Sequence, residues 1–202
     1  SNPLKVGKAR FSVYTPQVIR IEYSPGGIFE DAPSTTAVNR VLAKTLSFNS
    51  GLDNGAFHLE TQGVKLWYEV GADLSAALGC EGLNVTITAT GVTWCLSMGV
   101  APPSQQNLNG SFETTDCYVG WRQCLNVFDA KMQPGVVSRS GYAVINDTTA
   151  DLFDGYSSLP WRHARRGEIG YRDYLFFGHG LDYKQALKDY TLIGGSVPLM
   201  PW

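Results

Sequence analysis

The stretches FHLETQGVKLWYEV (Phe57–Val70) and LNVTITATGVTWCLSM (Leu83–Met98) indicate the fold most directly. In both, apolar residues alternate with polar ones, a period of two that is typical of a β-strand with one buried face. Turns are expected at Gln62-Gly63 and Thr90-Gly91, and after the second turn the apolar positions change parity, as a tight hairpin requires. The apolar positions are Val64, Leu66, Tyr68 and Val70, then Leu83, Val85, Ile87 and Ala89, then Val92, Trp94, Leu96 and Met98. Regular short strands between turn residues predict an all-β, antiparallel β-sandwich.

Further strands are predicted before this meander. Phe11–Val13 and Val18–Tyr23 are separated by a Thr15-Pro16 turn, and the second strand places Arg20 and Glu22 on the face opposite its apolar residues. Residues 28–55 are predicted to be rich in loops. Three apolar residues of that segment are expected to fold back over a sheet edge: Phe29, Val38 and Val41.

The stretch PGVVSRSGYAVIND (Pro134–Asp147) predicts a turn, a polar cluster and a short strand. Tyr142 and Val144 are expected to face one way, and Ala143 and Ile145 the other. The cluster that precedes the strand places Arg139 at the rim of a sheet, where a ligand can reach it.

The last part of the sequence predicts one buried strand and one helix. Tyr171–Phe177 has the composition of a buried strand. Asp182 can cap a following helix, and Gly194-Gly195 can end it. The residues expected on the buried face of that helix, at helical spacing, are Tyr183, Ala186, Leu187 and Tyr190.

Composition restricts the class of protein. The chain has 202 residues, of which 44% are hydrophobic and 17% charged, and its 22 Gly and 10 Pro favour strands and turns over helices. A net charge of -2 gives no basic surface for nucleic acid or for an anionic membrane. No apolar run approaches the roughly 18 residues that a membrane-spanning helix needs. The expected class is a globular domain with neither of these partners.

The cysteines and sequons bear on compartment and on metal binding. None of the cysteine spacings is a CxxC and there is no Cys–His cluster, so no metal site is expected, and up to two disulfides are possible. The four cysteines are Cys80, Cys95, Cys117 and Cys124. Three Asn-x-Ser/Thr triplets are candidate glycosylation sites, at Asn84, Asn109 and Asn146. Together these features favour a secretory, lysosomal or extracellular protein.

Four segments, in this order along the chain, resemble the amino-terminal domain of glycoside hydrolase family 31, the α-glucosidases and α-xylosidases. They are RFSVYTPQVIRIEYSPGGIFEDAPSTTAVNR (Arg10–Arg40), NLNGSFETTD (Asn107–Asp116), PGVVSRSGYAVIND (Pro134–Asp147) and YLFFGHGLDYKQALKDYTLIGGSVPLMPW (Tyr174–Trp202). The resemblance covers nearly the whole chain. It implies a galactose-mutarotase-like sandwich at residues 1–181, an exit helix at 182–195, and at 196–202 the start of a linker to a (β/α)₈ barrel.

The resemblance also implies which chemistry this chain lacks. The family is retaining and uses two barrel aspartates, as nucleophile and as acid/base, without cofactor or metal. The family's nucleophile lies two residues after a Trp, and no such Asp is present here. The triplets are Trp67-Tyr-Glu, Trp94-Cys-Leu, Trp121-Arg-Gln and Trp161-Arg-His. The chain alone is therefore expected to be inactive, as a piece of a longer polypeptide that acts on an α-linked oligosaccharide or glycoside.

By the same resemblance, one polar loop of the sandwich reaches the sugar subsite. The matching substrate-binding residue is Asp116, whose carboxylate can accept two sugar hydroxyls, and Arg139 is expected at the cleft rim, where it holds that loop. The sequence departs from the family here. Glu113-Thr-Thr stands where Trp-Asn-Arg is commonest, and Ser111 stands where the segment often ends in Glu.

Two other functions remain open from the residues alone. A carbohydrate-binding module would stack sugars on Trp121 and Trp161, which lie in predicted loops, whereas Trp67 and Trp94 lie in strand patterns and are expected in the core. A sugar epimerase on such a sandwich would need a His facing a Glu. The three histidines are interpreted instead as structural (His58, His179) or solvated, with His163 in a basic loop that also holds Arg162, Arg165 and Arg166.

Overall fold

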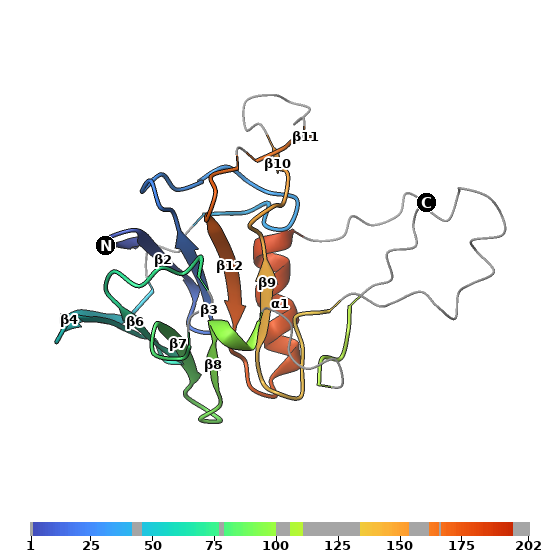
Figure 1. Cartoon of the computed structure of the whole chain (residues 1–202). Coiled ribbons are helices and arrows are strands. Elements are labelled where there is room, and N and C mark those ends of the chain that lie inside the picture. The colour runs from blue at the N-terminus through green and yellow to red at the C-terminus, as the bar shows by residue number, and fades with distance from the viewer. Residues whose placement is uncertain are drawn as a thin grey trace.

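The computed structural model describes residues 2–41, 46–76, 79–99, 106–110, 134–153, 162–165 and 167–195. Two five-stranded antiparallel sheets form the framework of this part of the chain (Figure 1). The first sheet has the order β1 (Leu4–Val6), β2 (Ala9–Thr15), β3 (Val18–Tyr23), β12 (Arg172–Phe177) and β9 (Ala143–Asn146). The second has the order β4 (Asn49–Asp53), β5 (Ala56–Glu60), β6 (Val64–Glu69), β7 (Leu83–Ile87) and β8 (Thr93–Cys95). The predicted antiparallel β-sandwich is confirmed.

The core lies between the two sheets, and its aromatic residues come from both. Phe11 of β2 stacks on Phe57 of β5 with ring centroids 5.2 Å apart, and Trp94 of β8 lies 5.5 Å from Phe176 of β12. All four side chains are buried. Burial of such large apolar surfaces is the dominant favourable term in folding, so these contacts hold the sheets face to face.

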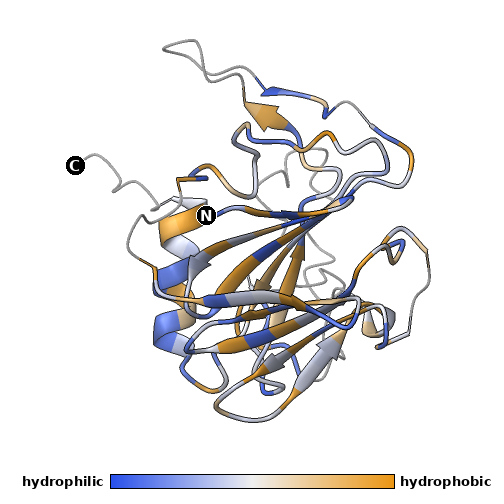
Figure 2. Cartoon of the chain, turned by 90° about the vertical axis from the view of Figure 1, so that its left-hand side faces the viewer, coloured by the Kyte–Doolittle hydropathy of each residue, from blue (hydrophilic) through white to orange (hydrophobic). Residues whose placement is uncertain are grey.

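The one α-helix among the described residues, α1 (Tyr183–Gly194), covers the other face of the first sheet, as the two views of the ribbon illustrate (Figures 1 and 2). Ile193 packs there in a second apolar cluster with Val18, Leu175 and Phe177. The first sheet is therefore covered on both faces, which explains why every residue of β2 and β3 is buried.

Several local predictions are confirmed. Tyr142 and Val144 lie in the core between the sheets, whereas Ala143 lies in the cluster under α1 and Ile145 packs against it. The side chain of Asp182 accepts a hydrogen bond from the backbone N–H of Gln185 at 3.1 Å, so it caps α1. The helix ends at Gly194, as predicted.

The predicted buried face of α1 is partly wrong. Leu187 is 52% exposed, and Asp189 is buried in its place beside Ala186 and Ile193. The Asp189 carboxylate accepts from Thr15 Oγ1 at 2.7 Å and lies 2.9 Å from Nε2 of His179. Burial raises the pKa of Asp189, but these hydrogen bonds outweigh it and hold the pKa below its usual range. Thr15 on the sheet and His179 in the turn after β12 thus select the helix face, and His179 has a structural role.

Three other expectations need correction. Val41 is 80% exposed and does not pack over a sheet edge. The hairpin strand stops at Cys95, after which Leu96–Met98 forms a 3₁₀ turn and Met98 is half-exposed. Trp94 is fully buried as expected, but Trp67 lies on the outward face of β6 and is only half-buried.

The described residues settle one disulfide and leave the other two cysteines untested. Cys80 and Cys95 are bonded, which ties β8 to the turn before β7. Cys117 and Cys124 lie outside the described residues. A two-stranded ribbon, β10 (Leu152–Phe153) with β11 (Arg162–His163), completes the secondary structure of the described residues.

Candidate functional site

Asn107 joins the two described ends of the segment that the sequence predicts to face substrate. Its Nδ2 donates to the carbonyl of Gly135 at 2.9 Å, and its Oδ1 accepts from the backbone N–H of Gly135 at 2.8 Å and of Asn109 at 2.7 Å. The side chain is buried. This side-chain amide, the Asn107 clamp, therefore fixes the described backbone on both sides of residues 111–133.

Arg139 lies beside this clamp, exposed in the turn before β9. Its backbone N–H donates to the carbonyl of Gln106 at 2.7 Å. The preceding residue, Ser138, forms an isolated antiparallel β-bridge with Asn107. Asp116 lies outside the described residues, so the expected meeting of Asp116 and Arg139 at a sugar subsite stays a prediction.

The three candidate glycosylation sites lie in different settings. Asn84 points outward from β7, and its Nδ2, the atom that would carry a glycan, donates to the carbonyl of Cys80 at 3.0 Å. Asn109 and Asn146 are exposed, the first in a left-handed conformation with φ 65° and the second at the end of β9. Glycosylation at the three sites stays a prediction.

The three histidines are far apart in the fold. His58 is exposed on the outward face of β5, His163 is exposed in β11, and His179 contacts Asp189 beneath α1. Among the described residues, no group of three or more His, Cys, Asp or Glu side chains could hold a metal ion. No helix among them is long and apolar enough to cross a membrane.

A layer of charged side chains is buried on the outward face of the first sheet, at the end that α1 does not cover. Arg20 of β3 binds Asp173 of β12 with both ends of its guanidinium, Nε to Oδ1 at 2.9 Å and Nη2 to Oδ2 at 2.7 Å. Arg20 Nη2 also lies 2.9 Å from Glu22, which in turn binds Arg10 Nε at 2.6 Å. Bidentate pairs of this kind are the strongest and the most directional ion pairs in proteins.

Two arginines from the loops extend this layer. Arg165 binds Asp173 at 3.0 Å through Nη1 and Asp147 at 2.9 Å through Nη2, and Arg40 binds the same oxygen of Asp147 at 2.5 Å. The Arg165 side chain is only 5% exposed. The expectation of a solvated basic loop is therefore wrong for Arg165, whose side chain points inward, and right for the exposed Arg162 and His163.

The charged layer keeps its groups in defined protonation states. Burial raises the pKa of Asp173. The guanidinium of Arg20, together with those of Arg40 and Arg165, lowers this pKa by more than burial raises it, so the pKa of Asp173 lies below its usual value. Burial, with Asp173 and Glu22 nearby, raises the pKa of the Tyr171 hydroxyl far above its usual value. Tyr171 therefore stays neutral and donates to Glu22 at 3.1 Å.

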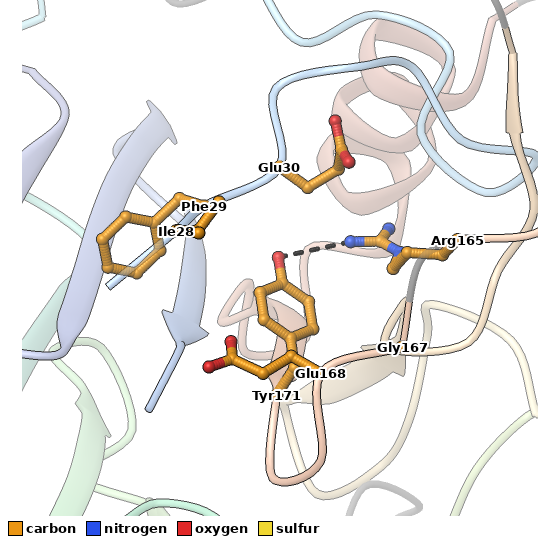
Figure 3. Close-up of a pocket in the computed structure, with 7 residues that line it drawn as sticks. All are labelled: Ile28, Phe29, Glu30, Arg165, Gly167, Glu168 and Tyr171. Atoms are coloured by element: carbon orange, nitrogen blue, oxygen red, sulfur yellow. Dashed lines mark hydrogen bonds between the residues drawn. The ribbon is translucent and has the colours of Figure 1, made fainter. Parts of the chain in front are cut away.

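A cavity of about 410 Å³ lies over this layer (Figure 3). Arg165 and Tyr171 line it together with Ile28, Phe29, Glu30 and Glu168. The carbonyl of Glu30 accepts from Arg10 at 3.0 Å and from Arg20 at 2.8 Å, so the charged layer fixes the loop that forms the opposite wall. Glu168 is held by Ser24 Oγ at 2.6 Å and by the backbone N–H of Gly26.

The sequence indicated this cavity only weakly. Arg20 and Glu22 alternate with apolar residues in β3, a pattern that is typical of a strand with one face in solvent. The pattern therefore does not indicate that both side chains are buried in ion pairs. Asp147 appeared to end a polar turn, yet it is fully buried. The only local indication of buried charge was that Arg20 and Glu22 lie among the aliphatic residues of a strand.

Comparison with known proteins reveals likeness in structure. No family model matches the chain, and no curated protein matches it in sequence. A GH31 dextranase of Flavobacterium johnsoniae is similar in structure at 14% identity with a TM-score of 0.52, both in its complex with isomaltotriose (96% of this chain, 26% of that chain) and in its complex with glucose (99% and 29%). A cycloalternan-forming enzyme of Listeria monocytogenes, in complex with a pentasaccharide, has a TM-score of 0.48 at 12% identity over 96% of this chain and 20% of that chain.

At this identity the dextranase comparison shows the shared fold. The described chain spans little more than a quarter of each dextranase chain, so it corresponds to one part of a much longer protein there.

The charged layer can be tested by breaking its central pair. Arg20→Met leaves the Asp173 carboxylate buried without its bidentate partner, and we expect a loss of about 3–5 kcal/mol in the free energy of unfolding, measured by urea denaturation. Lys65→Met is the control, because Lys65 and Glu60 form an ion pair at 2.8 Å whose side chains are 56% and 51% exposed. Its expected loss is about 0–1 kcal/mol. Equal losses for the two variants would contradict the importance of the buried pair.

The hydrogen bonds of the Asn107 clamp predict that Gly135 cannot be replaced by a residue with a side chain. A Cβ at Gly135 would lie 2.5 Å from the carbonyl oxygen of Asn109 and 2.8 Å from its carbon, and backbone atoms cannot move away freely. We expect Gly135→Ala to cost about 1–3 kcal/mol in unfolding free energy and to speed amide exchange at Asn109. Gly51→Ala, where a Cβ meets no atom within 4 Å, is the matched control. If both variants behave alike, the clamp does not constrain the loop ends.

Proposed function

We propose that the chain is the amino-terminal β-sandwich domain of a family 31 α-glycoside hydrolase. In this role it packs against a catalytic (β/α)₈ barrel and walls one side of the sugar-binding cleft, and it is not catalytic alone. The observation that carries the proposal is the sandwich shared with a GH31 dextranase, over nearly all of this chain and about a quarter of that one. The order of the four family-like segments supports the same assignment.

The division of the chain follows from this proposal. Residues 1–181 form the sandwich, whose galactose-mutarotase-like character belongs to the proposal, 182–195 form the exit helix, and 196–202 begin the linker to the barrel. The position of α1 supports this division, because its buried face is satisfied by the first sheet through Asp189 and Ile193. Exposed Leu187 and Leu192 on α1 then offer apolar surface to a following domain.

The chemistry is carried by the proposed barrel and not by this chain. Retaining hydrolysis needs two carboxyl groups about 5–5.5 Å apart on either side of the glycosidic bond, and it needs neither cofactor nor metal. The sandwich contributes substrate positioning. Its loop, which leaves the fold at the Asn107 clamp, would bring Asp116 to the sugar hydroxyls of an α-linked oligosaccharide, and Arg139 would hold the loop at the rim.

A carbohydrate-binding module remains the second candidate, and one observation favours it. Trp67 lies half-buried on the outward face of β6, between His58 of β5 and Asn84 of β7 in the strand register. An indole on an open sheet face can stack on the apolar face of a pyranose. Trp121 and Trp161, the residues first expected to do so, lie outside the described residues.

The substrate-positioning role predicts the effect of one substitution. In the full enzyme, Asp116→Ala should lower kcat/KM by a factor equivalent to about 1–3 kcal/mol, because hydrogen bonds to a charged acceptor are lost at the sugar. Steady-state kinetics with the preferred α-glycoside measures this. Asp151→Ala, which removes an exposed ion pair with Arg162, is the control and should leave kcat/KM unchanged. An unchanged value for Asp116→Ala would remove Asp116 from the site.

The gene itself separates the two candidates. If the native coding sequence continues past Trp202 into a barrel that contains a Trp-x-Asp motif, the domain assignment holds. A stop codon directly after Trp202 would contradict it and leave the binding module.

A further inference from the structure

The outward face of the second sheet carries one large aromatic side chain, that of Trp67 on β6. Figure 1 shows α1 on the opposite side of the sandwich from β6 and β7, because the helix packs on the first sheet. Around Trp67 the side chains of His58, Lys65 and Glu69 are exposed, whereas Trp67 itself is half-buried. The indole therefore lies on a sheet face that is open to solvent.

Asn84 lies directly opposite Trp67, on the neighbouring strand β7. Both side chains point outward, because Leu66, Leu83 and Val85 beside them are buried in the core. Opposite residues on antiparallel strands place their Cβ atoms about 4.5–5.5 Å apart on the same face of the sheet. A group attached to the side chain of Asn84 therefore begins beside the indole.

Asn84 also opens the triplet Asn84-Val85-Thr86, the acceptor pattern for N-glycosylation. Its Nδ2 donates to the carbonyl of Cys80 at 3.0 Å, which orients the side chain. An amide nitrogen of this kind has two hydrogens, so one remains for a sugar to replace. Cys80 is bonded to Cys95, and such disulfides are typical of the oxidising secretory compartments in which N-glycans are attached.

The other two triplets lack an accessible ring in the described part of the chain. The residue opposite Asn146 is Tyr174, which is only 7% exposed. The side chain of Asn146 moreover accepts from the backbone N–H of Thr148 at 3.1 Å. Asn109 lies outside the strands, in a left-handed conformation with φ 65°. Among the three candidates, Asn84 thus has the setting in which an attached sugar can contact an aromatic side chain.

The chemistry of the first sugar of an N-glycan suits this neighbour. It is a neutral N-acetylhexosamine, and one face of its pyranose ring presents C–H groups that pack on an indole. A tethered sugar is present at an effective concentration in the millimolar range or above, so a contact too weak to hold a free monosaccharide can still be occupied.

We propose that Asn84 carries an N-glycan whose first sugar stacks on Trp67. In the transfer, Nδ2 forms a bond to the anomeric carbon of the sugar, the bond from that carbon to a lipid diphosphate donor breaks, and Nδ2 loses one proton. The modification goes beyond the proposed function, since it requires neither a barrel nor a substrate. It also occupies the ring on which a carbohydrate-binding module would hold a free sugar.

The test uses the 202-residue chain, secreted from a eukaryotic host that attaches oligomannose glycans. Peptide mass spectrometry should show that Asn84 is occupied. Thr86→Ser, which keeps the acceptor triplet, is the matched control and should stay occupied, whereas Thr86→Ala should not. An endoglycosidase that leaves only the first sugar on Asn84 should not change Tm, measured by differential scanning calorimetry.

The contact with Trp67 is tested by a double-mutant cycle, because Thr86→Ala also removes the hydrogen bond to Thr93 at 2.8 Å. That loss is the same whether or not residue 67 is substituted, so it cancels. Thr86→Ala should therefore lower Tm by about 2–4 °C more in the unsubstituted chain than in Trp67→Leu.

Four results would overturn the proposal. An unoccupied Asn84 would exclude the modification, and an equal change in Tm with and without Trp67 would exclude the stacking. A fall in Tm after trimming to one sugar would place the stabilising contact farther along the glycan. Dimerisation of Thr86→Ala that is abolished by adding Trp67→Leu would assign this sheet face to a second copy of the chain. None of these results depends on whether a barrel follows Trp202.

Discussion

The rest of the structure depends on the buried bidentate contact between Arg20 and Asp173. It joins two strands whose residues are 153 positions apart in sequence, at the centre of the first sheet. Two charges taken out of water cost several kcal/mol each unless their hydrogen bonds are satisfied, so this pair is stable only if its neighbours are fixed as well. Glu22, Arg10 and Arg165 supply those further contacts. Because each buried charge needs hydrogen-bonding partners, the ion pair of Arg20 and Asp173 is stable only as part of an extended layer of charged side chains.

The layer connects the sandwich to its loops. One end of the outward sheet face is covered by α1 through apolar packing, and the other end by loops through charge and hydrogen bonding. The loop containing Glu30 is held by arginine donors on its carbonyl rather than by apolar side chains. Such a loop can keep a fixed shape without a core of its own, and it forms one wall of the cavity over the layer.

The sequence predicted the fold well, because strand alternation reports directly on which face is buried. The parity of Tyr142 and Val144 and the cap at Asp182 were right for this reason. The candidate site was harder to predict, because charged residues in a strand normally indicate a face exposed to solvent. Arg20 is buried only because Asp173, 153 residues away in sequence, meets it, and Arg165 only because Asp147 and Asp173 both bind it. Likewise α1 buries Asp189 rather than Leu187 because Asp189 meets Thr15 of β2 and His179, which lies in the turn between β12 and α1. Pairings of this kind are non-local and leave no periodic signal.

We propose that this sandwich assists glycoside hydrolysis by a longer protein without performing it. The most direct measurement compares the release of p-nitrophenol from a panel of p-nitrophenyl α-glycosides by two purified proteins. One is residues 1–202, and the other is the complete product of the native gene. The account predicts turnover by the longer protein and none by the shorter one. Turnover by residues 1–202 alone, or none by the longer protein with any glycoside of the panel, would contradict it.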